Sequence, residues 1–226
     1  MRTSSPSPVT SAPAVSSVKP FAPIRSLGPA HRERMATHLM ALNPADRYLR
    51  FGYPAGDAQI RHYVNGLNLE RDDVFGIFNR RLELVAMAHL AHGSGPDCPS
   101  CAEFGVSVSA HVRGRGYGKR LFDRAVMHGR NQGVEQLFIH ALTENSAMLS
   151  IAAQAGARLV RDGSETEAFL QLPPANLDSL LTEMVQEQLA QSDYRWKAQW
   201  YGLRHVLGLL PGVGTAATPP RERSQA

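Results

Sequence analysis

Apolar side chains recur every three or four residues in five stretches of the chain, and this spacing predicts amphipathic helices. The predicted helices begin near Pro29, cover residues 57–67, follow a glycine-rich loop at 113–118, lie within 143–157 and run from 177 to 210. Shorter apolar runs bounded by turn residues predict strands. These runs lie at residues 24–27, 74–78, 82–90, 103–109, 135–142, 157–161 and 167–172. The second and third strands are predicted to pair as a hairpin around a tight turn at Asn79–Arg81.

This succession of helices and strands predicts one mixed α/β (α+β) domain at residues 24–174. The leader at 1–23 is rich in Ser, Pro and Ala. It cannot bury enough apolar surface to offset the entropy lost on ordering, so we expect it to be disordered. Residues 175–210 are predicted to form a helical tail, and the Pro/Gly/Thr-rich end at 211–226 is expected to be loose.

The tail carries two apolar stripes with a break between them at Ser192-Asp193. The first stripe consists of Leu177, Leu180, Leu181, Met184, Val185 and Leu189, and the second of Trp196, Trp200, Leu203, Leu207 and Leu210. Stripes of this size are rarely left in water. We therefore expect the first segment to pack on the domain and the second to meet a partner, as a homodimer or a docked tail. The basic residues around the stripes are few, so we do not expect membrane attachment.

Composition narrows the class of protein. The chain has 226 residues, 43% of them apolar, which is typical of a globular domain, and no apolar run approaches a membrane span. No apolar signal-peptide core follows the first charges, and two cysteines cannot build a secreted disulfide framework. These features favour the cytoplasm as the location of the protein.

The net charge of +4 is mild but uneven along the chain. Between residues 111 and 130 there are six Arg or Lys residues against a single acid, Asp123. A local basic patch of this kind attracts phosphate groups. It surrounds the stretch "RGRGYGKRL", which begins at Arg113.

Several phosphate-binding motifs do not fit this loop. A P-loop needs GxxxxGK followed by Ser or Thr, whereas Arg113 stands five places before Gly118 and Arg120 follows Lys119. The glycine spacing is GxGxG rather than the GxGxxG of dinucleotide-binding folds. A nucleic-acid-binding RGG segment would not lie between a strand and an amphipathic helix, so we expect no nucleic-acid partner. The simplest alternative is a turn whose glycines only relieve crowding.

The remaining interpretation is a strand, then Arg-x-x-Gly-x-Gly, then a helix. Such a loop lets backbone N–H groups turn inward, and the helix N-terminus adds a partial positive charge. This arrangement is suited to a pyrophosphate, with Arg113 and Lys119 available for outer phosphates.

The stretch "VSVSAHVRGRGYGKRLFDRAV" resembles the acetyl-CoA-binding motif of the GNAT superfamily of N-acetyltransferases, which is Gln/Arg-x-x-Gly-x-Gly/Ala after a strand. "NSAMLSIAAQAGA" resembles the second motif of the family. In that second motif Asn145, Met148, Ile151 and Gly156 take the family positions, and Ala152 stands where the family has a tyrosine. The stretches "DRYLRF" and "AEFGVSV" look most like bacterial GNAT domains related to the protein-lysine acetyltransferases. The resemblance covers about residues 24–172.

The resemblance implies a GNAT-type fold, with a largely antiparallel central sheet of six to seven strands flanked by helices. It implies transfer of acetyl from acetyl-CoA, a co-substrate, to a primary amine by direct attack, the acceptor being a protein lysine or a small amine. It assigns twelve residues to cofactor binding: Val106, Ser107, Val108, Arg113, Gly114, Arg115, Gly116, Tyr117, Gly118, Lys119, Asn145 and Met148. The same strand segment is also compatible with an ordinary core strand.

Glu103, in "AEF", is the candidate general base. Aminolysis of a thioester needs a neutral amine, and a carboxylate near the amine accepts its proton directly or through one water. The alternative is a solvated charge at the end of a strand. The missing tyrosine at Ala152 removes the usual general acid and leaves water as the proton source. A rival class is therefore a non-catalytic acyl-CoA-binding regulatory module.

The stretch "HLAHGSGPDCPSC" contains four residues able to bind zinc: His89, His92, Cys98 and Cys101. The two histidines have opposite parity on a predicted strand, so their side chains would leave opposite faces of the sheet. A single CxxC in a Gly/Pro loop is often just two thiols. We therefore predict no metal.

Overall fold

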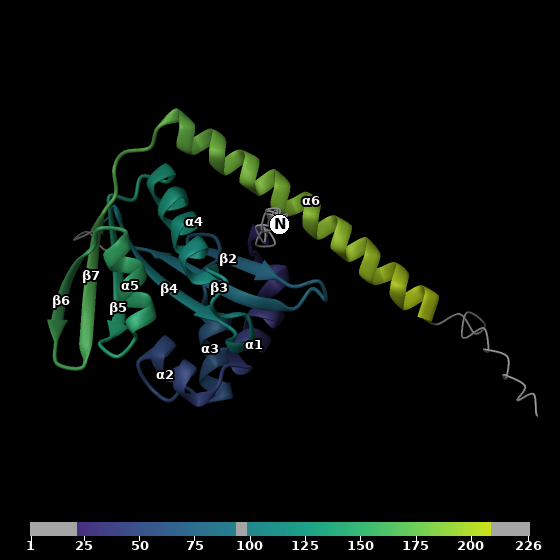
Figure 1. Ribbon diagram of the computed structural model, residues 1–226, viewed down its shortest axis with the longest axis horizontal. Coiled ribbons are helices and arrows are strands. Elements are labelled where there is room, and N and C mark those ends of the chain that lie inside the picture. Colours follow the sequence, from purple (N-terminus) through teal and green to yellow (C-terminus); the bar gives the residue numbers. More distant parts are fainter. Residues whose placement is uncertain (1–21, 94–98, 209–226) are drawn as a thin grey trace, which may run out of the picture.

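The computed structural model describes residues 22–93 and 99–208, with backbone alone for 195–208. A seven-stranded sheet in the order β1-β2-β3-β4-β5-β7-β6 forms the centre (Figure 1). Its strands are β1 Ile24–Ser26, β2 Asp73–Phe78, β3 Leu84–His92, β4 Cys101–Val108, β5 Gln136–Leu142, β6 Arg158–Asp162 and β7 Glu165–Gln171. The β4–β5 pair is parallel and the other five neighbouring pairs are antiparallel. The predicted fold class is confirmed.

Helices cover both faces of the sheet. The short η1 (Pro29–His31), α1 (Arg32–Met40), α2 (Pro44–Phe51) and α3 (Asp57–Gly66) precede β2, and η2 (Ala110–Val112), α4 (Tyr117–Asn131) and α5 (Ser146–Gln154) follow β4. Successive side chains of a strand point to opposite faces. Phe75 and Ile77 accordingly join the core under α4 and α5, whereas Val74 and Phe78 join the core under α1 and α3.

The helix predicted to begin at Pro29 is two helices, which corrects the sequence-based interpretation. The first helix ends at Met40, and Asn43 caps the second helix by accepting a hydrogen bond from the Asp46 N–H at 2.8 Å. Pro44 occupies the first helical position, where its missing N–H costs nothing. This cap places α2 beside β4, next to the site described below.

The tail forms one helix, α6 (Leu177–Gly208), which runs across α4 and β1 and continues beyond the sheet (Figure 1). It passes through Ser192-Asp193 without interruption, so the predicted break there is wrong. The side chains of the second predicted stripe lie outside the described residues, as do the chain ends at 1–21 and 209–226.

The first stripe of the tail does not pack on the domain, contrary to expectation. Its six side chains are exposed by 41% to 78%. The opposite face of α6 docks instead, through Glu183, Glu187, Ala190 and Tyr194. The physical reason lies in α4, whose buried Arg124 requires carboxylate partners, and α6 supplies both of them.

The buried polar cluster under α6 centres on His128. Its Nε2 lies 3.0 Å from Asp73 on β2, and its Nδ1 bonds Glu183 on α6. Burial alone would lower the pKa of His128, but the hydrogen bonds to Asp73 and Glu183 raise it to about 9. The same contacts hold the pKa of Asp73 and of Glu183 below their usual range, against the effect of burial. The cluster is therefore a charged one at neutral pH.

This cluster predicts a fall in stability at alkaline pH. The folded-state pKa of His128 lies above its unfolded value of 6.5, so its contribution is complete below pH 6.5 and is lost as pH rises through 9. We expect the free energy of unfolding to fall by on the order of 2 kcal/mol across that interval. His128→Gln should flatten this decline in urea titrations. His111→Gln, at an exposed position, serves as the matched control and should leave the slope as in the wild type.

No helix in the described part of the chain is long and apolar enough to cross a membrane.

Candidate active site

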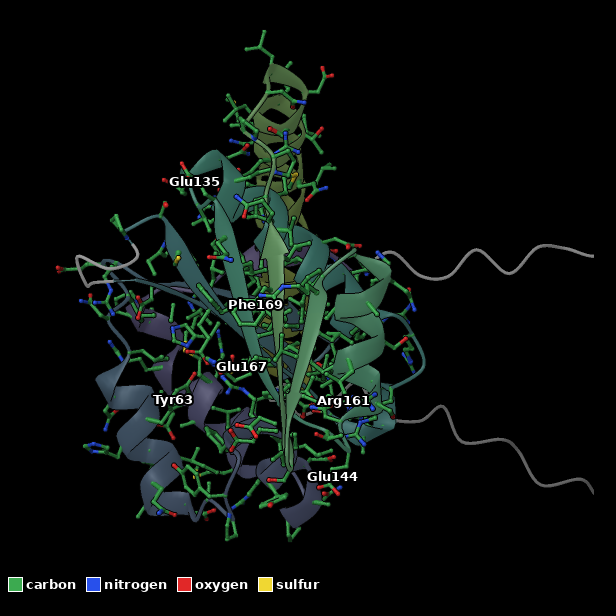
Figure 2. The ribbon with its side chains drawn as sticks, turned by 90° about the vertical axis from the view of Figure 1, so that its left-hand side faces the viewer. Tyr63, Glu135, Glu144, Arg161, Glu167 and Phe169 are labelled. Carbon is green, nitrogen blue, oxygen red and sulfur yellow. The ribbon has the colours of Figure 1, made fainter. Side chains whose placement is uncertain are left out.

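The separation of β4 from β5 opens the site. The two strands pair from Cys101–Gln136 to Glu103–Phe138, and beyond Glu103 the ladder stops while both strands continue. Main-chain groups on the facing edges are thereby left available to a ligand. Glu135 and Glu144, which flank β5, mark the two ends of this strand (Figure 2).

A cavity of about 460 Å³, here called the loop cavity, lies between α2, the free end of β4, α5 and the N-terminus of α4. Eleven of the twelve residues predicted to bind the cofactor line it: Val106, Ser107, Val108, Arg113, Gly114, Gly116, Tyr117, Gly118, Lys119, Asn145 and Met148. The remaining one, Arg115, is exposed and lies outside the lining.

The glycine loop has the backbone that the motif needs. Gly114 and Gly116 have φ angles of +74° and +77°, in the left-handed region that favours glycine, although a Cβ at either position would meet no atom within 4 Å. Gly116 is the N-cap of α4, so the first N–H groups of this helix lack partners within it. At Gly118 the reason is contact instead, because a Cβ there would lie 3.3 Å from Ile151 Cδ1.

The basic side chains of the loop are already paired. Arg113 forms an ion pair with Asp46 of α2, and Lys119 pairs with Asp123 one helical turn on, at 2.7 Å. Both were expected to be available for phosphates, so a ligand would have to compete with these carboxylates. The backbone N–H groups and the helix N-terminus remain the principal anion-binding features.

Two predicted residues, Ser107 and Asn145, contribute through hydrogen bonds within the protein. Ser107 is buried and its Oγ lies 2.9 Å from Nε2 of His38, whose Nδ1 is 3.1 Å from the Leu84 carbonyl. Burial lowers the pKa of His38 to about 4, so the ring is neutral and fastens β4 to α1. Asn145 caps α5, its side chain accepting from the Met148 N–H at 3.2 Å.

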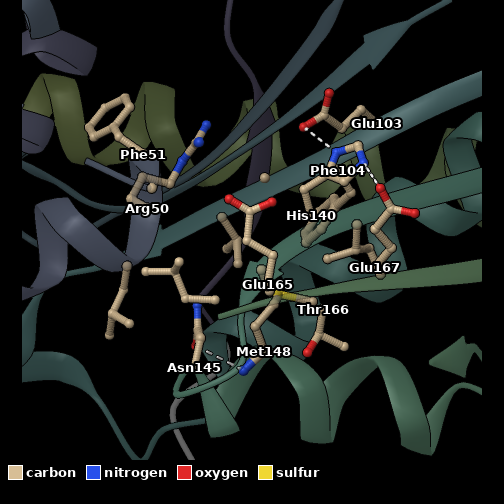
Figure 3. A pocket seen from close by; sticks show the side chains of 17 residues that line it. Arg50, Phe51, Glu103, Phe104, His140, Asn145, Met148, Glu165, Thr166 and Glu167 are labelled. Atoms are coloured by element: carbon tan, nitrogen blue, oxygen red, sulfur yellow. Dashed lines mark hydrogen bonds and ion pairs between the residues drawn. The ribbon is translucent and has the colours of Figure 1, made fainter. Parts of the chain in front are cut away.

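A second cavity of about 250 Å³, here called the acidic cavity, adjoins the loop cavity. Both are lined by Leu49, Arg50, Val106, Asn145 and Met148. Three carboxylates line the acidic cavity, namely those of Glu103, Glu165 and Glu167. His140 bridges two of them, with Nδ1 3.4 Å from Glu103 and Nε2 3.3 Å from Glu167 (Figure 3).

Ala152, at the position of the family tyrosine, lies outside both cavities. Its side chain is completely buried in the core under α5, and it lines neither cavity. Ala147, Met148 and Ile151 of α5 line the loop cavity, and Ala152 does not. A tyrosine ring at this position would overpack the core, which costs about 1–3 kcal/mol.

The histidines considered for zinc have protein partners. His89 Nδ1 lies 2.9 Å from the Tyr63 hydroxyl, and His92 Nε2 lies 2.8 Å from Asp73. Cys101 carries a disulfide bond, in contrast to the free thiol expected from the sequence, and Cys98 lies outside the described residues. No cluster of three or more metal-binding side chains occurs in the described ranges.

The fold and the loop cavity together define an acyltransferase that uses a coenzyme A thioester. The model of the acetyltransferase (GNAT) family matches residues 36–157, more than half of the chain. The chain belongs to this family and is an acetyl-CoA-dependent acyltransferase.

Solved structures support the same fold. The GNAT domain of S. lividans PAT superposes with a TM-score of 0.57 at 18% identity, covering 66% of this chain and 89% of that one. An N-acetyltransferase from Staphylococcus aureus Mu50 gives 0.55 at 15% identity, covering 68% and 100%. A phosphinothricin acetyltransferase from Sinorhizobium meliloti, solved with AcCoA, gives 0.55 at 15% identity, covering 69% and 94%. No curated protein matches the chain.

Four residues of the acidic cavity were missed from the sequence: Arg50, His140, Glu165 and Glu167. Arg50 lies in "DRYLRF", a stretch whose family likeness does not single out any one side chain. His140 and the two glutamates alternate with buried residues on β5 and β7, a pattern typical of any strand with one exposed face.

Proposed function

We propose that the protein is an N-acetyltransferase that moves acetyl from acetyl-CoA to a primary amine, with Glu103 as the general base. The observation that carries this proposal is the position of Glu103. It is the last residue of β4 paired with β5, and its carboxylate opens into the acidic cavity, which shares five lining residues with the loop cavity. A base at this position faces the cavity that adjoins the loop cavity.

The proposed reaction is a direct transfer. The Glu103 carboxylate takes a proton from the bound ammonium, directly or through one water. The neutral nitrogen attacks the thioester carbonyl and the C–N bond forms. The C–S bond then breaks, and the nitrogen gives its remaining extra proton to water. Coenzyme A leaves as a thiolate and takes a proton from water. Main-chain N–H groups of Val106–Val108 are suited to stabilise the oxyanion.

The loop cavity fits the co-substrate in its chemistry. The N-terminus of α4 and the left-handed backbone at Gly114 and Gly116 would hold the pyrophosphate. The free edge of β4 at Val106, Ser107 and Val108 would pair with the pantetheine amides.

An acyl-transfer screen tests the proposal. The protein is incubated with acetyl-CoA and a set of amines and lysine peptides, and acetylated products are identified by mass spectrometry. Acetylation of at least one amine class supports it. Tight binding of acetyl-CoA without product on any amine would favour the alternative, a non-catalytic acyl-CoA-binding regulatory module.

We further propose that the exposed stripe of α6 pairs with a second copy of the chain. The six side chains of the stripe together expose on the order of 600 Å² of apolar surface, at the upper end of what monomers tolerate. Two copies would bury about 1,200 Å² through the stripes alone, which passes the roughly 1,000 Å² expected of a specific interface.

A charge at the centre of the stripe should prevent this pairing. Leu181→Asp together with Met184→Asp is expected to halve the mass in solution, measured by light scattering, because paired apolar faces reject buried carboxylates. Thr182→Asp, exposed on the flank of the same helix, is the matched control and should keep the mass of a dimer. A wild-type protein that is monomeric at about 100 µM, or that binds anionic vesicles instead, would overturn the proposal.

A further inference from the structure

The guanidinium of Arg50 lies at the junction of the two cavities and has no carboxylate partner among the described residues. Arg50 lies in the last turn of α2 and lines both the acidic and the loop cavity. Within the described part of the chain it donates one hydrogen bond, to the Tyr63 hydroxyl at 2.8 Å, and makes no ion pair. By contrast, nearby Arg47 and Arg113 are each paired with an aspartate.

The guanidinium of Arg50 lies near two aromatic rings and against β4. Its Cζ lies 5.2 Å from the centre of the Phe51 ring and 5.5 Å from that of Tyr63, within cation–π range. A Cβ at Gly105 would lie 2.8 Å from Cζ, so the guanidinium occupies the space that a side chain on β4 would take. A side chain at position 105 would displace the guanidinium from this position.

A chain of hydrogen bonds runs from Arg50 through the Tyr63 hydroxyl to His89, and its donors and acceptors can be assigned. The Tyr63 hydroxyl accepts from Arg50, so it donates to His89 Nδ1, 2.9 Å away. The proton of the ring then sits on Nε2, which faces the buried carboxylate of Asp72 at 3.5 Å. Burial and the charge of Arg50 lower the pKa of His89, which keeps the ring neutral and the chain of hydrogen bonds intact. Tyr63 is thus a positioning residue for Arg50.

Arg50 of α2 and Glu103 of β4 line the same cavity, and the Arg50 guanidinium lies over Gly105 of β4. Gly105, under the guanidinium, and Glu103 are two residues apart on β4, so they share a face at a spacing of about 7 Å. Figure 3 shows Arg50 on one side of the cavity, the Glu103–His140–Glu167 group on the other and Glu165 between them. The cavity therefore has one positive and one negative end.

We propose that the acidic cavity binds a small zwitterionic acceptor, an amino acid or a close analogue. Its carboxylate is held by the free donors of Arg50, and its amine lies against Glu103. The cavity, at about 250 Å³, is smaller than the pockets that hold drug-sized ligands. A guanidinium binds a planar carboxylate through two parallel hydrogen bonds, which sets the direction of the acceptor. This inference rests on the proposed acetyltransferase function and narrows it to small acceptors.

Matched pairs of acceptors test the inference: L-phenylalanine against phenethylamine, L-tyrosine against tyramine and L-lysine against cadaverine. With acetyl-CoA, we expect kcat/KM to be about 10- to 100-fold higher for the partner that carries the carboxylate in at least one pair. Arg50→Gln should remove this preference by lowering only the higher value. Arg61→Gln, on exposed α3, is the matched arginine control and should retain it.

Tyr63→Phe tests the positioning role. It should raise KM for the amino acid with little change in kcat, and should leave the decarboxylated amine unaffected. Equal rates within every pair, or equal losses for both partners in Arg50→Gln, would overturn the inference while leaving the proposed transferase intact.

Binding separates the two proposals if no amine is acetylated. Ligand-observed NMR of the same pairs on CoA-loaded protein should still show the carboxylate preference and its loss in Arg50→Gln. That result would reject only the transferase. No preference in binding would reject the inference as well.

Discussion

Replacing Glu103 with glutamine is expected to lower turnover by about 10²-fold or more, with the affinity for acetyl-CoA nearly unchanged. Glutamine keeps the size of the side chain and loses the proton acceptor. The loss should appear in kcat, because the amine must be deprotonated for attack whether or not it is saturating. Steady-state kinetics with calorimetry of acetyl-CoA binding measures both quantities.

Two controls make this result specific. Glu135 is exposed and directly precedes the first residue of β5 (Figure 2), and Glu135→Gln should leave turnover unchanged. Glu167→Gln removes the other carboxylate beside His140, with a side chain exposed to a similar degree. If Glu167→Gln costs as much as Glu103→Gln, the base is the His140 group as a whole. Wild-type turnover and pH dependence in Glu103→Gln would reduce Glu103 to a surface charge.

Much of the fold was accessible from the sequence because its signals are local. Left-handed backbone requires glycine at Gly114 and Gly116, and alternation marks β5 and β7, so the loop and strands could be placed without tertiary information. The break between α1 and α2 was accessible as well. Asn43-Pro44 is a cap followed by proline, a signal that the apolar periodicity across it concealed.

What escaped prediction depends on pairing across the fold. The apolar stripe of α6 was expected to face the domain, since periodicity shows which residues share a face and not what covers it. The acidic face of α6 docks instead, because Arg124 and His128 of α4 are buried and pair with Glu183 and Glu187. The role of Arg50 could not be predicted for the same reason. Its position depends on Gly105 beneath it, and it has no carboxylate partner among the described residues. Both features depend on residues that are distant from Arg50 in the sequence.

The glycine loop yields the second large effect. Gly116→Asp is expected to weaken acetyl-CoA binding by about 10²- to 10³-fold, because it puts a carboxylate within a few ångströms of the proposed pyrophosphate position at the N-terminus of α4. Space is not the obstacle, since a Cβ there meets nothing within 4 Å. The change therefore isolates charge and backbone conformation.

Gly133→Asp separates these two contributions. Gly133 has a φ of +84°, follows the other end of the same helix and is equally open, so an aspartate there carries a similar backbone cost. It should lower the melting temperature about as much as Gly116→Asp and leave the calorimetric affinity for acetyl-CoA as in the wild type. Gly116→Ala adds the strain at the loop without the charge and should fall between the two in affinity. If Gly116→Asp binds acetyl-CoA as tightly as Gly133→Asp does, the N-terminus of α4 does not hold the phosphates.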